Sequence, residues 1–207
     1  MTSLVPVTSL VVVDHGAGNL VSISQGLAAS GARVEISADP AVIATADGVV
    51  LPGVGATATV MGGIIAGGLT ETLRSLQVPV LGICVGMQVL FDRSEEDGAR
   101  CLGVIPGVVR RLEGTPRLPH IGWNDVDGSH PLLVGTDRTF YFVHSYAPVP
   151  DDADVIIGLT DYDDVFVSAV ASGNFFGVQF HPERSGSAGL RLLANFVSLC
   201  AEVSFAS

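Results

Sequence analysis

The sequence predicts an α/β protein with a mostly parallel central sheet that is flanked by helices. Through roughly the first 90 residues, short apolar runs alternate with helical patterns, which is typical of a parallel sheet covered on both faces. Beyond that point short strands dominate, so an additional antiparallel portion is expected in the second half. Hydrophobic residues make up 48% of the 207 residues and charged residues 15%, which favours a domain with a sizeable core over a disordered chain.

The first half reads as four strands with helices between them. Each strand is an apolar or alternating run that ends in a glycine-rich turn or a polar segment. The strands are expected at residues 10–14, 33–37, 48–51 and 80–83. Helical patterns follow, and Gly31 closes the first of them. The helices are expected at residues 20–30, 69–76 and 85–91, with a small-residue helical region after Gly55.

The second half reads as six short strands and a final helix. The strands are expected around residues 102–112, 120–126, 140–146, 155–160, 165–170 and 175–180. The last two are joined by ASGN, which favours a hairpin. Apolar residues recur at helical spacing from Leu190 to Cys200, so a helix is expected to pack back on the sheet. Without an internal repeat or linker, the pattern favours a single domain over residues 1–207, in which residues 1–9 are a short N-terminal extension.

The composition argues against several classes of function. The formal net charge is −11 and all ten basic residues are Arg, so no basic surface for nucleic acid is expected. Apolar runs are too short to span a membrane, and the N-terminus lacks the features of a signal peptide. The three cysteines are too few and too scattered for a disulfide framework or a zinc site, and no metal or cofactor is expected.

The heptapeptide GICVGMQ, which begins at Gly82, is the most informative segment. It places Cys84 between two glycines where a strand is expected to give way to a helix. A cysteine on such a turn exposes its sulfur near the positive end of a helix dipole, which favours the thiolate. The glycines leave room for the turn, so the arrangement has the form of a nucleophile elbow with sulfur in place of a hydroxyl. Because a catalytic thiol must stay reduced, a cytoplasmic location is expected.

A candidate base lies far downstream in GVQFHPERSG. His181 and Glu183 are two residues apart at the end of an expected strand, where alternation puts both side chains on one side. The carboxylate can orient the imidazole while the other ring nitrogen faces the Cys84 thiol, which gives a candidate orienting group, base and nucleophile. Taken alone, Cys84 could be a buried hydrophobic residue and His181 an ordinary loop residue. The two glycine-framed segments together favour catalysis.

Thiolate attack on an amide generates an oxyanion, which needs preorganised N–H donors. The N–H of Val85, directly after the nucleophile, is one candidate. The second is expected from the loop PGVG, where Gly53 and Gly55 permit peptide flips, so Gly53 and Val54 are the candidate residues. In isolation this loop could be an ordinary turn.

Five segments, PGVGA, GICVGMQ, LPHIGWN, FYFVHSY and GVQFHPERSG, occur in an order and spacing that resembles the class I (triad-type) glutamine amidotransferases. More narrowly, the chain resembles the glutaminase subunits of imidazole glycerol phosphate synthase from histidine biosynthesis, for which PHIGWN and YFVHSY are the narrower markers. The likeness runs from DHGAGN at Asp14 to the final helix and implies a flavodoxin-like α/β fold.

The resemblance implies a specific reaction. Cys84 would attack the carboxamide of L-glutamine, and His181 would protonate the leaving ammonia and then activate water against the thioester. The positions that match the family's substrate pocket are Gln88, Glu96, Ser145 and Tyr146. The first two would hold the amino-acid end of the substrate, and the last two would line the pocket through their backbone. Within SEED, however, Glu96 could be one of several solvated charges.

The resemblance also implies a heterodimer. The family's partner is a (β/α)8 barrel cyclase that uses the ammonia to convert PRFAR to imidazole glycerol phosphate and AICAR. The positions that match the interface are Asn19, Trp123 and Tyr141. Asn19 could instead cap the helix that begins at Leu20, and the two aromatic residues could belong to the core. In the family the glutaminase is nearly idle until the partner is loaded, which a flip of the PGVG peptide would explain.

Three residues depart from the family pattern outside the candidate triad. His15 stands where Tyr is common, Thr57 where Phe is frequent, and Arg184 where Lys usually follows HPE. These departures bear on contacts with the partner rather than on the reaction. The alternative hypotheses are a glutaminase subunit of another class I amidotransferase, a stand-alone γ-glutamyl cysteine hydrolase, and a non-catalytic binding module on the same fold.

Overall fold

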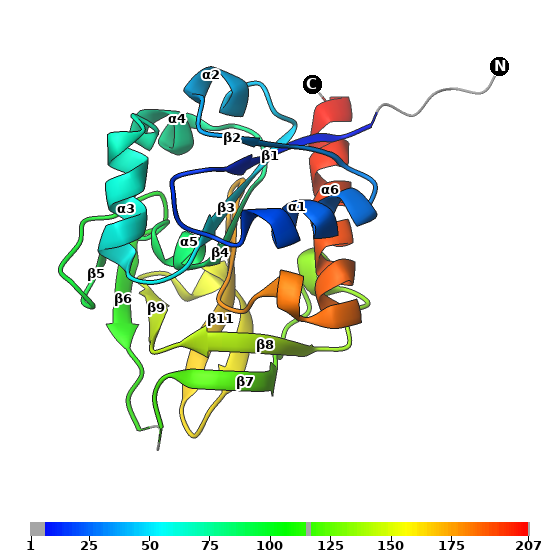
Figure 1. Cartoon of the computed structure of the whole chain (residues 1–207). Coiled ribbons are helices and arrows are strands. Elements are labelled where there is room, and N and C mark those ends of the chain that lie inside the picture. Colours follow the sequence, from blue (N-terminus) through cyan, green and yellow to red (C-terminus); the bar gives the residue numbers. More distant parts are fainter. Residues whose placement is uncertain (1–6, 115–116, 207) are drawn as a thin grey trace.

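The computed structural model describes residues 7–114 and 117–206 (Figure 1). Most of the expected N-terminal extension, residues 1–6, lies outside the described residues. The first strand begins at Ser9, one residue earlier than expected, and the N–H of Arg33 donates to the carbonyl of Thr8 directly before it. The backbone pairing between the first two strands therefore already includes Thr8, which lies within the expected extension of residues 1–9.

A seven-stranded sheet forms the centre of the molecule, with the strand order β10-β11-β12-β4-β3-β1-β2. The strands are β1 (Ser9–Val13), β2 (Arg33–Ser37), β3 (Gly48–Gly53), β4 (Val80–Cys84), β10 (Ile156–Asp161), β11 (Val165–Ser172) and β12 (Phe175–Val178). The pairs from β12 through β2 are parallel, and β10 and β11 add an antiparallel edge. Every residue of β3 and β4 is buried, as expected for parallel strands covered on both faces.

Helices cover the two faces of this sheet. They are α1 (Leu20–Ala29), α2 (Pro40–Ile43), α3 (Thr57–Ala66), α4 (Thr70–Ser75), α5 (Val85–Gln88) and α6 (Gly186–Ala206), with three 3-10 turns, η1 (Pro131–Leu133), η2 (Ala153–Val155) and η3 (Pro182–Arg184). Figure 1 shows α3 and α4 on one side of β3 and β4, with α1 and α6 on the other. The expected C-terminal helix is confirmed: Leu193 of α6 packs so closely on Gly26 of α1 that a side chain at Gly26 would overlap it.

Two smaller sheets contain antiparallel pairs in the second half, where an antiparallel portion was expected. One joins β5 (Arg93–Ser94), β6 (Gly107–Arg111) and β9 (Tyr146–Pro150), and the other pairs β7 (His120–Asp125) with β8 (Thr139–His144). The pairs β6–β9 and β7–β8 are antiparallel, and β5 adds a short parallel pair to the first of these sheets. The predicted strand at 140–146 is in fact two strands, because the chain bends at Ser145 and passes from one sheet to the other. The hairpin predicted at ASGN is confirmed, with Ser172 opposite Phe175.

The helix predicted at residues 85–91 is wrong in length, since α5 ends at Gln88. After Val89 the hydrogen bonding changes, because the N–H groups of Leu90 and Phe91 donate to carbonyls only three residues back, those of Met87 and Gln88. The carbonyls of residues 89–91 in turn accept hydrogen bonds from the N–H groups of residues 102–105, which hold this segment in a turn. The sequence interpretation also missed α2, which has Asp39 as N-cap and Pro40 at its first position.

Candidate active site

Cys84 is the last residue of β4 and lies on a sharp turn before α5. Its backbone has φ 55° and ψ −112°, a left-handed conformation that residues with a side chain rarely adopt. A Cβ at Gly82 would lie 2.5 Å from the carbonyl oxygen of Gly86, and a Cβ at Gly86 would overlap the carbonyl of Leu51. The two glycines are therefore required by close backbone packing, and the turn predicted from GICVGMQ is present. With a single helical turn, α5 contributes little dipole.

His181 and Glu183 come together through a turn rather than along a strand. The sequence placed both on one side of a strand, but β12 ends at Val178, and Pro182–Arg184 form the 3-10 turn η3. This turn brings His181 Nδ1 within 2.9 Å of Glu183 Oε1. The backbone of His181 is also held, because its N–H donates to the Tyr141 carbonyl and its carbonyl accepts from the Ser185 hydroxyl at 2.6 Å.

The electrostatics of His181 favour a charged imidazole. Burial lowers the pKa of His181, but hydrogen bonds with Cys84 and Glu183, together with their negative charge, raise it from 6.5 to about 10. The Glu183 side chain is 1% exposed, so its charge acts on the imidazole with little solvent screening. An imidazolium held between a buried carboxylate and a cysteine sulfur is the arrangement in which a histidine assists a nucleophilic cysteine.

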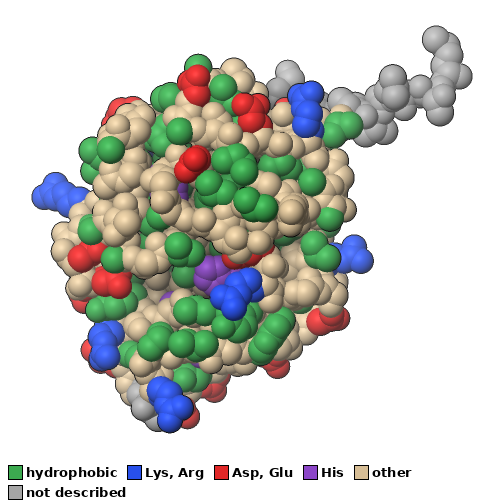
Figure 2. Space-filling model, in the orientation of Figure 1, with side chains coloured by type: hydrophobic (Ala, Val, Ile, Leu, Met, Phe, Trp, Pro, Cys, Tyr) green, Lys and Arg blue, Asp and Glu red, His purple; other side chains and the backbone are tan. Residues whose placement is uncertain are grey.

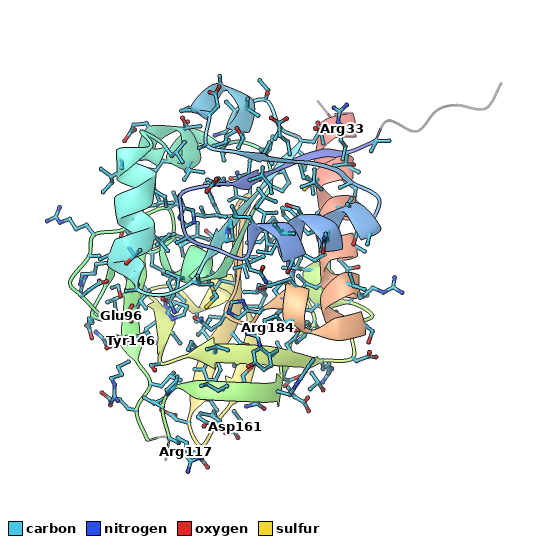
Figure 3. The ribbon with its side chains drawn as sticks, viewed as in Figure 1. Arg33, Glu96, Arg117, Tyr146, Asp161 and Arg184 are labelled. Carbon is cyan, nitrogen blue, oxygen red and sulfur yellow. The ribbon has the colours of Figure 1, made fainter. Side chains whose placement is uncertain are left out.

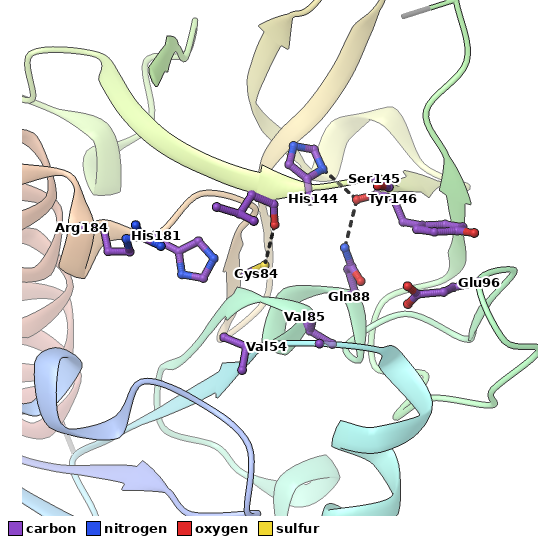
Figure 4. A pocket seen from close by; sticks show the side chains of 12 residues that line it. Val54, Cys84, Val85, Gln88, Glu96, His144, Ser145, Tyr146, His181 and Arg184 are labelled. Carbon is purple, nitrogen blue, oxygen red and sulfur yellow. Dashed lines mark hydrogen bonds between the residues drawn. The ribbon is translucent and has the colours of Figure 1, made fainter. Parts of the chain in front are cut away.

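A cavity of about 180 Å³ opens over Cys84 and His181 (Figure 4). Its lining consists of Val54, Gly55, Cys84, Val85, Gln88, Glu96, Val143, His144, Ser145, Tyr146, His181 and Arg184. Figure 2 shows a hollow near the centre of one face, with a His side chain inside it and an Arg side chain beside it. In the same view, Figure 3 labels Arg184 near the centre and places Glu96 and Tyr146 next to each other.

The structure brings most of the predicted site residues together. The cavity is lined by the catalytic candidates Cys84 and His181 and by the oxyanion candidates Val54 and Val85. It is also lined by the four substrate candidates, Gln88, Glu96, Ser145 and Tyr146. Glu183 lies behind His181. Gly53 is buried beneath the cavity and pairs with Cys84 in the parallel ladder between β3 and β4.

The loop after β3 is tethered by His15, one of the departures noted in the sequence. The His15 side chain is buried and its Nε2 lies 2.6 Å from the Pro52 carbonyl oxygen. Because a carbonyl only accepts, Nε2 carries the proton and donates. This fixes the chain directly before Gly53, whereas Gly55 has φ 84° and Val54 is 41% exposed. Val54 and Gly55, the part of the loop that lines the cavity, lie beyond this tether.

Two of the three residues predicted for the partner interface, Trp123 and Tyr141, lie on the paired strands β7 and β8. Trp123 is 57% exposed, so it is not a core residue, and its ring meets that of Tyr141 edge-on at 5.8 Å. The guanidinium of Arg184 lies 4.1 Å from the centre of the Tyr141 ring. Asn19 occupies the N-cap position of α1, but its side chain makes no capping hydrogen bond. Its interpretation as a simple helix cap is therefore not supported.

Sequence reasoning missed Gln179, which is fully buried beside the nucleophile. Its side-chain N–H donates to Cys84 Sγ at 3.6 Å, and its carbonyl oxygen accepts from Gln88 Nε2 at 3.1 Å. Gln88 Nε2 also donates to the Tyr146 carbonyl at 3.0 Å (Figure 4). A polar residue two positions before His181, in an otherwise apolar strand, was the signal that could have identified Gln179.

Replacing Gln179 with leucine is expected to lower catalytic turnover at Cys84 by roughly 100-fold, because it removes a donor to the sulfur and leaves a buried N–H of Gln88 unpaired. Steady-state kinetics of amide hydrolysis measure this effect. The matched control is Gln77→Leu, since Gln77 is exposed and its side chain bonds, within the described part of the chain, to the neighbouring carbonyls of Ser75 and Leu76. A Gln179→Leu variant with the activity of the parent would contradict the assignment.

Comparisons with known proteins identify the family of this chain. Residues 11–200 match the family model of glutamine amidotransferase class-I. The chain is 47% identical to imidazole glycerol phosphate synthase subunit HisH of Halobacterium salinarum, with 94% of both chains covered. It is 45% identical to the HisH subunit of Dehalococcoides mccartyi, with 92% of this chain and 97% of that one covered.

Among solved structures, a chain of PurLQS from Thermotoga maritima superposes with a TM-score of 0.70 at 18% identity, covering 93% of this chain and 99% of that one. This likeness shows the fold. Within the described part of the chain, none of the helices has the length and apolar character that a membrane crossing requires. The class I fold, the elbow at Cys84 and the extent of the sequence identity lead to one assignment. This chain belongs to the class I glutamine amidotransferases and, within them, to the HisH subunits of imidazole glycerol phosphate synthase.

Proposed function

We propose that this chain hydrolyses L-glutamine to glutamate and ammonia with Cys84 as nucleophile, His181 as acid and base, and Glu183 as the residue that orients His181. The observation that carries the proposal is the contact between His181 and Glu183 at 2.9 Å, directly beside Cys84 at the cavity. A buried carboxylate, an imidazole and a thiol in this order are the components that nucleophilic amide hydrolysis requires.

The reaction follows from the positions of these groups. The Cys84 sulfur attacks the carboxamide carbon, and the N–H groups of Val85 and of the Gly53–Val54 region stabilise the oxyanion. His181 gives its proton to the leaving nitrogen, so that ammonia departs and a thioester remains. It then takes a proton from water, which attacks the thioester and releases glutamate and the thiol.

The amino-acid end of glutamine is assigned to the opposite part of the cavity. Glu96 supplies the negative charge that an α-ammonium group needs, and Gln88 lies between Glu96 and Cys84 (Figure 4). The backbones of Ser145 and Tyr146 line the same wall. These four residues are therefore proposed to hold the substrate while its carboxamide reaches the sulfur.

The ammonia is proposed to pass to a (β/α)8 barrel cyclase subunit, which converts PRFAR to imidazole glycerol phosphate and AICAR. The word "subunit" in the relatives' names supports a partner. The face that carries Trp123 also exposes Ile121, two residues earlier on the same side of β7, at 60%. An apolar face of this kind, with Tyr141 beside it and Asn19 at the N-cap of α1, is proposed as the docking surface. We further propose one domain over residues 1–207 and a cytoplasmic location, where the thiol stays reduced.

Glutamate release is expected to be slow for the isolated chain and to rise roughly 10- to 100-fold when the cyclase and its nucleotide substrate are added. A coupled glutamate assay of the chain alone and in the complex measures this rise. Trp123→Ala is the matching variant, because it removes an exposed aromatic residue from the proposed docking surface without touching the cavity. Full activity without any partner would instead indicate a stand-alone hydrolase.

A further inference from the structure

Thr57, the first residue of α3, touches the group that we assign to the substrate's amino end. It is completely buried, and its backbone N–H donates to Glu96 Oε2 at 3.2 Å. Its hydroxyl lies 3.3 Å from the same oxygen. We infer that Thr57 is a positioning residue that holds the Glu96 carboxylate for the α-ammonium group of the substrate. This inference rests on the proposed function of the cavity.

Glu96 is held from its own backbone as well. The Ser94 hydroxyl accepts a hydrogen bond from the Glu96 N–H at 3.2 Å and lies 3.2 Å from the Thr57 hydroxyl. Thr57, Ser94 and Glu96 therefore form a closed polar cluster, although Glu96 itself is half-buried. A carboxylate on a short loop loses most of its conformational freedom when both its backbone and one oxygen are fixed.

The free oxygen of Glu96 is the one that a ligand can use. Among the residues that the structure describes, none bonds Glu96 Oε1, and Figure 4 shows the carboxylate directed towards Gln88. The neighbouring Gln88 already gives its N–H groups to Tyr146 and Gln179, so only its oxygen remains as an acceptor. The Thr57 hydroxyl lies 3.5 Å from that oxygen too. The polar groups at this end of the cavity are mainly acceptors, which suits an ammonium group and not an anion.

A purely structural role for Glu96, as a cap of α3, is the alternative that the test must distinguish from substrate positioning. Glu96 and Asp97 both accept hydrogen bonds from the first turn of α3, Asp97 from the Ala58 N–H at 2.6 Å. These carboxylates could serve only to cap that helix. The backbone N–H of Thr57 supplies the capping contact whatever side chain it carries. The hydroxyl adds only the contacts with Glu96, Gln88 and Ser94, so removing the hydroxyl tests the positioning role alone.

The test compares Thr57→Val, which has nearly the same shape without the hydroxyl, with Thr57→Ser, which keeps the hydroxyl. Both are made in the complex with the cyclase, with Cys84→Ala added so that ligand is bound but not hydrolysed. Calorimetric titration with L-glutamine is expected to show Kd raised about tenfold by Thr57→Val and nearly unchanged by Thr57→Ser. Glutaramate, which is glutamine without the α-amino group, is expected to lose no affinity.

A second arm asks whether Thr57 acts through Glu96. In a Glu96→Gln background, Thr57→Val is expected to have no further effect on glutamine binding, because the charge that it positions is absent. An equal loss of affinity in both backgrounds, an equal loss for glutaramate, or an unchanged Kd in Thr57→Val would overturn the inference. If the helix start does not tolerate valine, Thr57→Ala replaces it in the same cycle. Failure of the Cys84→Ala parent complex to bind glutamine would instead refute the proposed function.

Discussion

Cys84→Ala is expected to lower glutamate release by at least about 10⁴-fold, because no other described side chain at the cavity can take over the attack on the carboxamide. The loss is chemical and not structural. Besides its contact with His181, the sulfur lies 3.6 Å from Gln179 Nε2 and 4.0 Å from the Val143 carbonyl, which are weak polar contacts. Alanine also meets the same backbone constraint as cysteine at φ 55°. A coupled glutamate assay and a thermal melt of the same sample separate the two effects.

Cys101→Ala is the matched control for that experiment. Burial, followed by the charges of Asp97 and Asp92, raises the pKa of the Cys101 thiol to about 12, so it stays protonated at neutral pH and is a poor nucleophile. Cys101 is partly accessible and lies outside the cavity. We expect the Cys101→Ala enzyme to retain full activity. Loss of activity in Cys101→Ala, or its retention in Cys84→Ala, would require a different nucleophile.

The buried strands were predictable because their side chains have no choice of environment. Strand β4, an apolar run between turn signals, was predicted within one residue, whereas the largely exposed edge strand β2 was predicted with both ends correct from the alternation in RVEIS. The errors occur where distant segments compete for backbone groups. Residues 89–91 carry a helical pattern, yet their carbonyls bond the segment 102–105, and no local pattern contains that information. The bend at Ser145 has the same origin, since β8 and β9 pair with different strands.

The residues proposed for the reaction stand out in the sequence for a different reason. Cys84 and His181 lie in segments whose glycine and proline spacing imposes a local backbone shape. The supporting residues have no such signature. Gln179 reaches Cys84 across 95 positions, and Thr57 reaches Glu96 across 39, so their roles depend on the assembled sheet. The contact between His181 and Glu183 was predicted correctly from an incorrect local structure, because a 3-10 turn can also bring residues two positions apart into contact.

Glu183→Gln is expected to reduce glutamate release by roughly 10³-fold, since it removes the charge that orients and stabilises the imidazolium while nearly preserving the shape. The amide can still accept from His181 Nδ1 through its oxygen. Its second polar atom, however, occupies the place of Glu183 Oε2, which is buried without a partner among the described residues. An N–H group there lacks an acceptor, so the variant loses stability as well as activity.

The loss of stability depends on pH in a direction that follows from His181. Its pKa rises from 6.5 to about 10 in the folded chain, so binding of the proton stabilises the fold fully below pH 6.5. This stabilisation is lost as the pH rises from 6.5 towards 10, where the folded imidazole also loses its proton. Glu183 contributes to the raised pKa of His181. The free energy of unfolding of the parent should therefore exceed that of Glu183→Gln by about 2 kcal/mol near pH 6, and this difference should shrink towards pH 10.

Denaturant unfolding at several pH values between 6 and 10 measures that difference, with Glu35→Gln as the control. Glu35 is exposed on β2, so its replacement should shift stability little and equally at all pH values. If the stability deficit of Glu183→Gln is constant with pH, the carboxylate contributes packing alone. If the deficit grows with pH, the coupling between Glu183 and protonation of His181 has the opposite sign. In either case the imidazolium would not be held by Glu183, and the low activity of the variant would need a cause other than the loss of that charge.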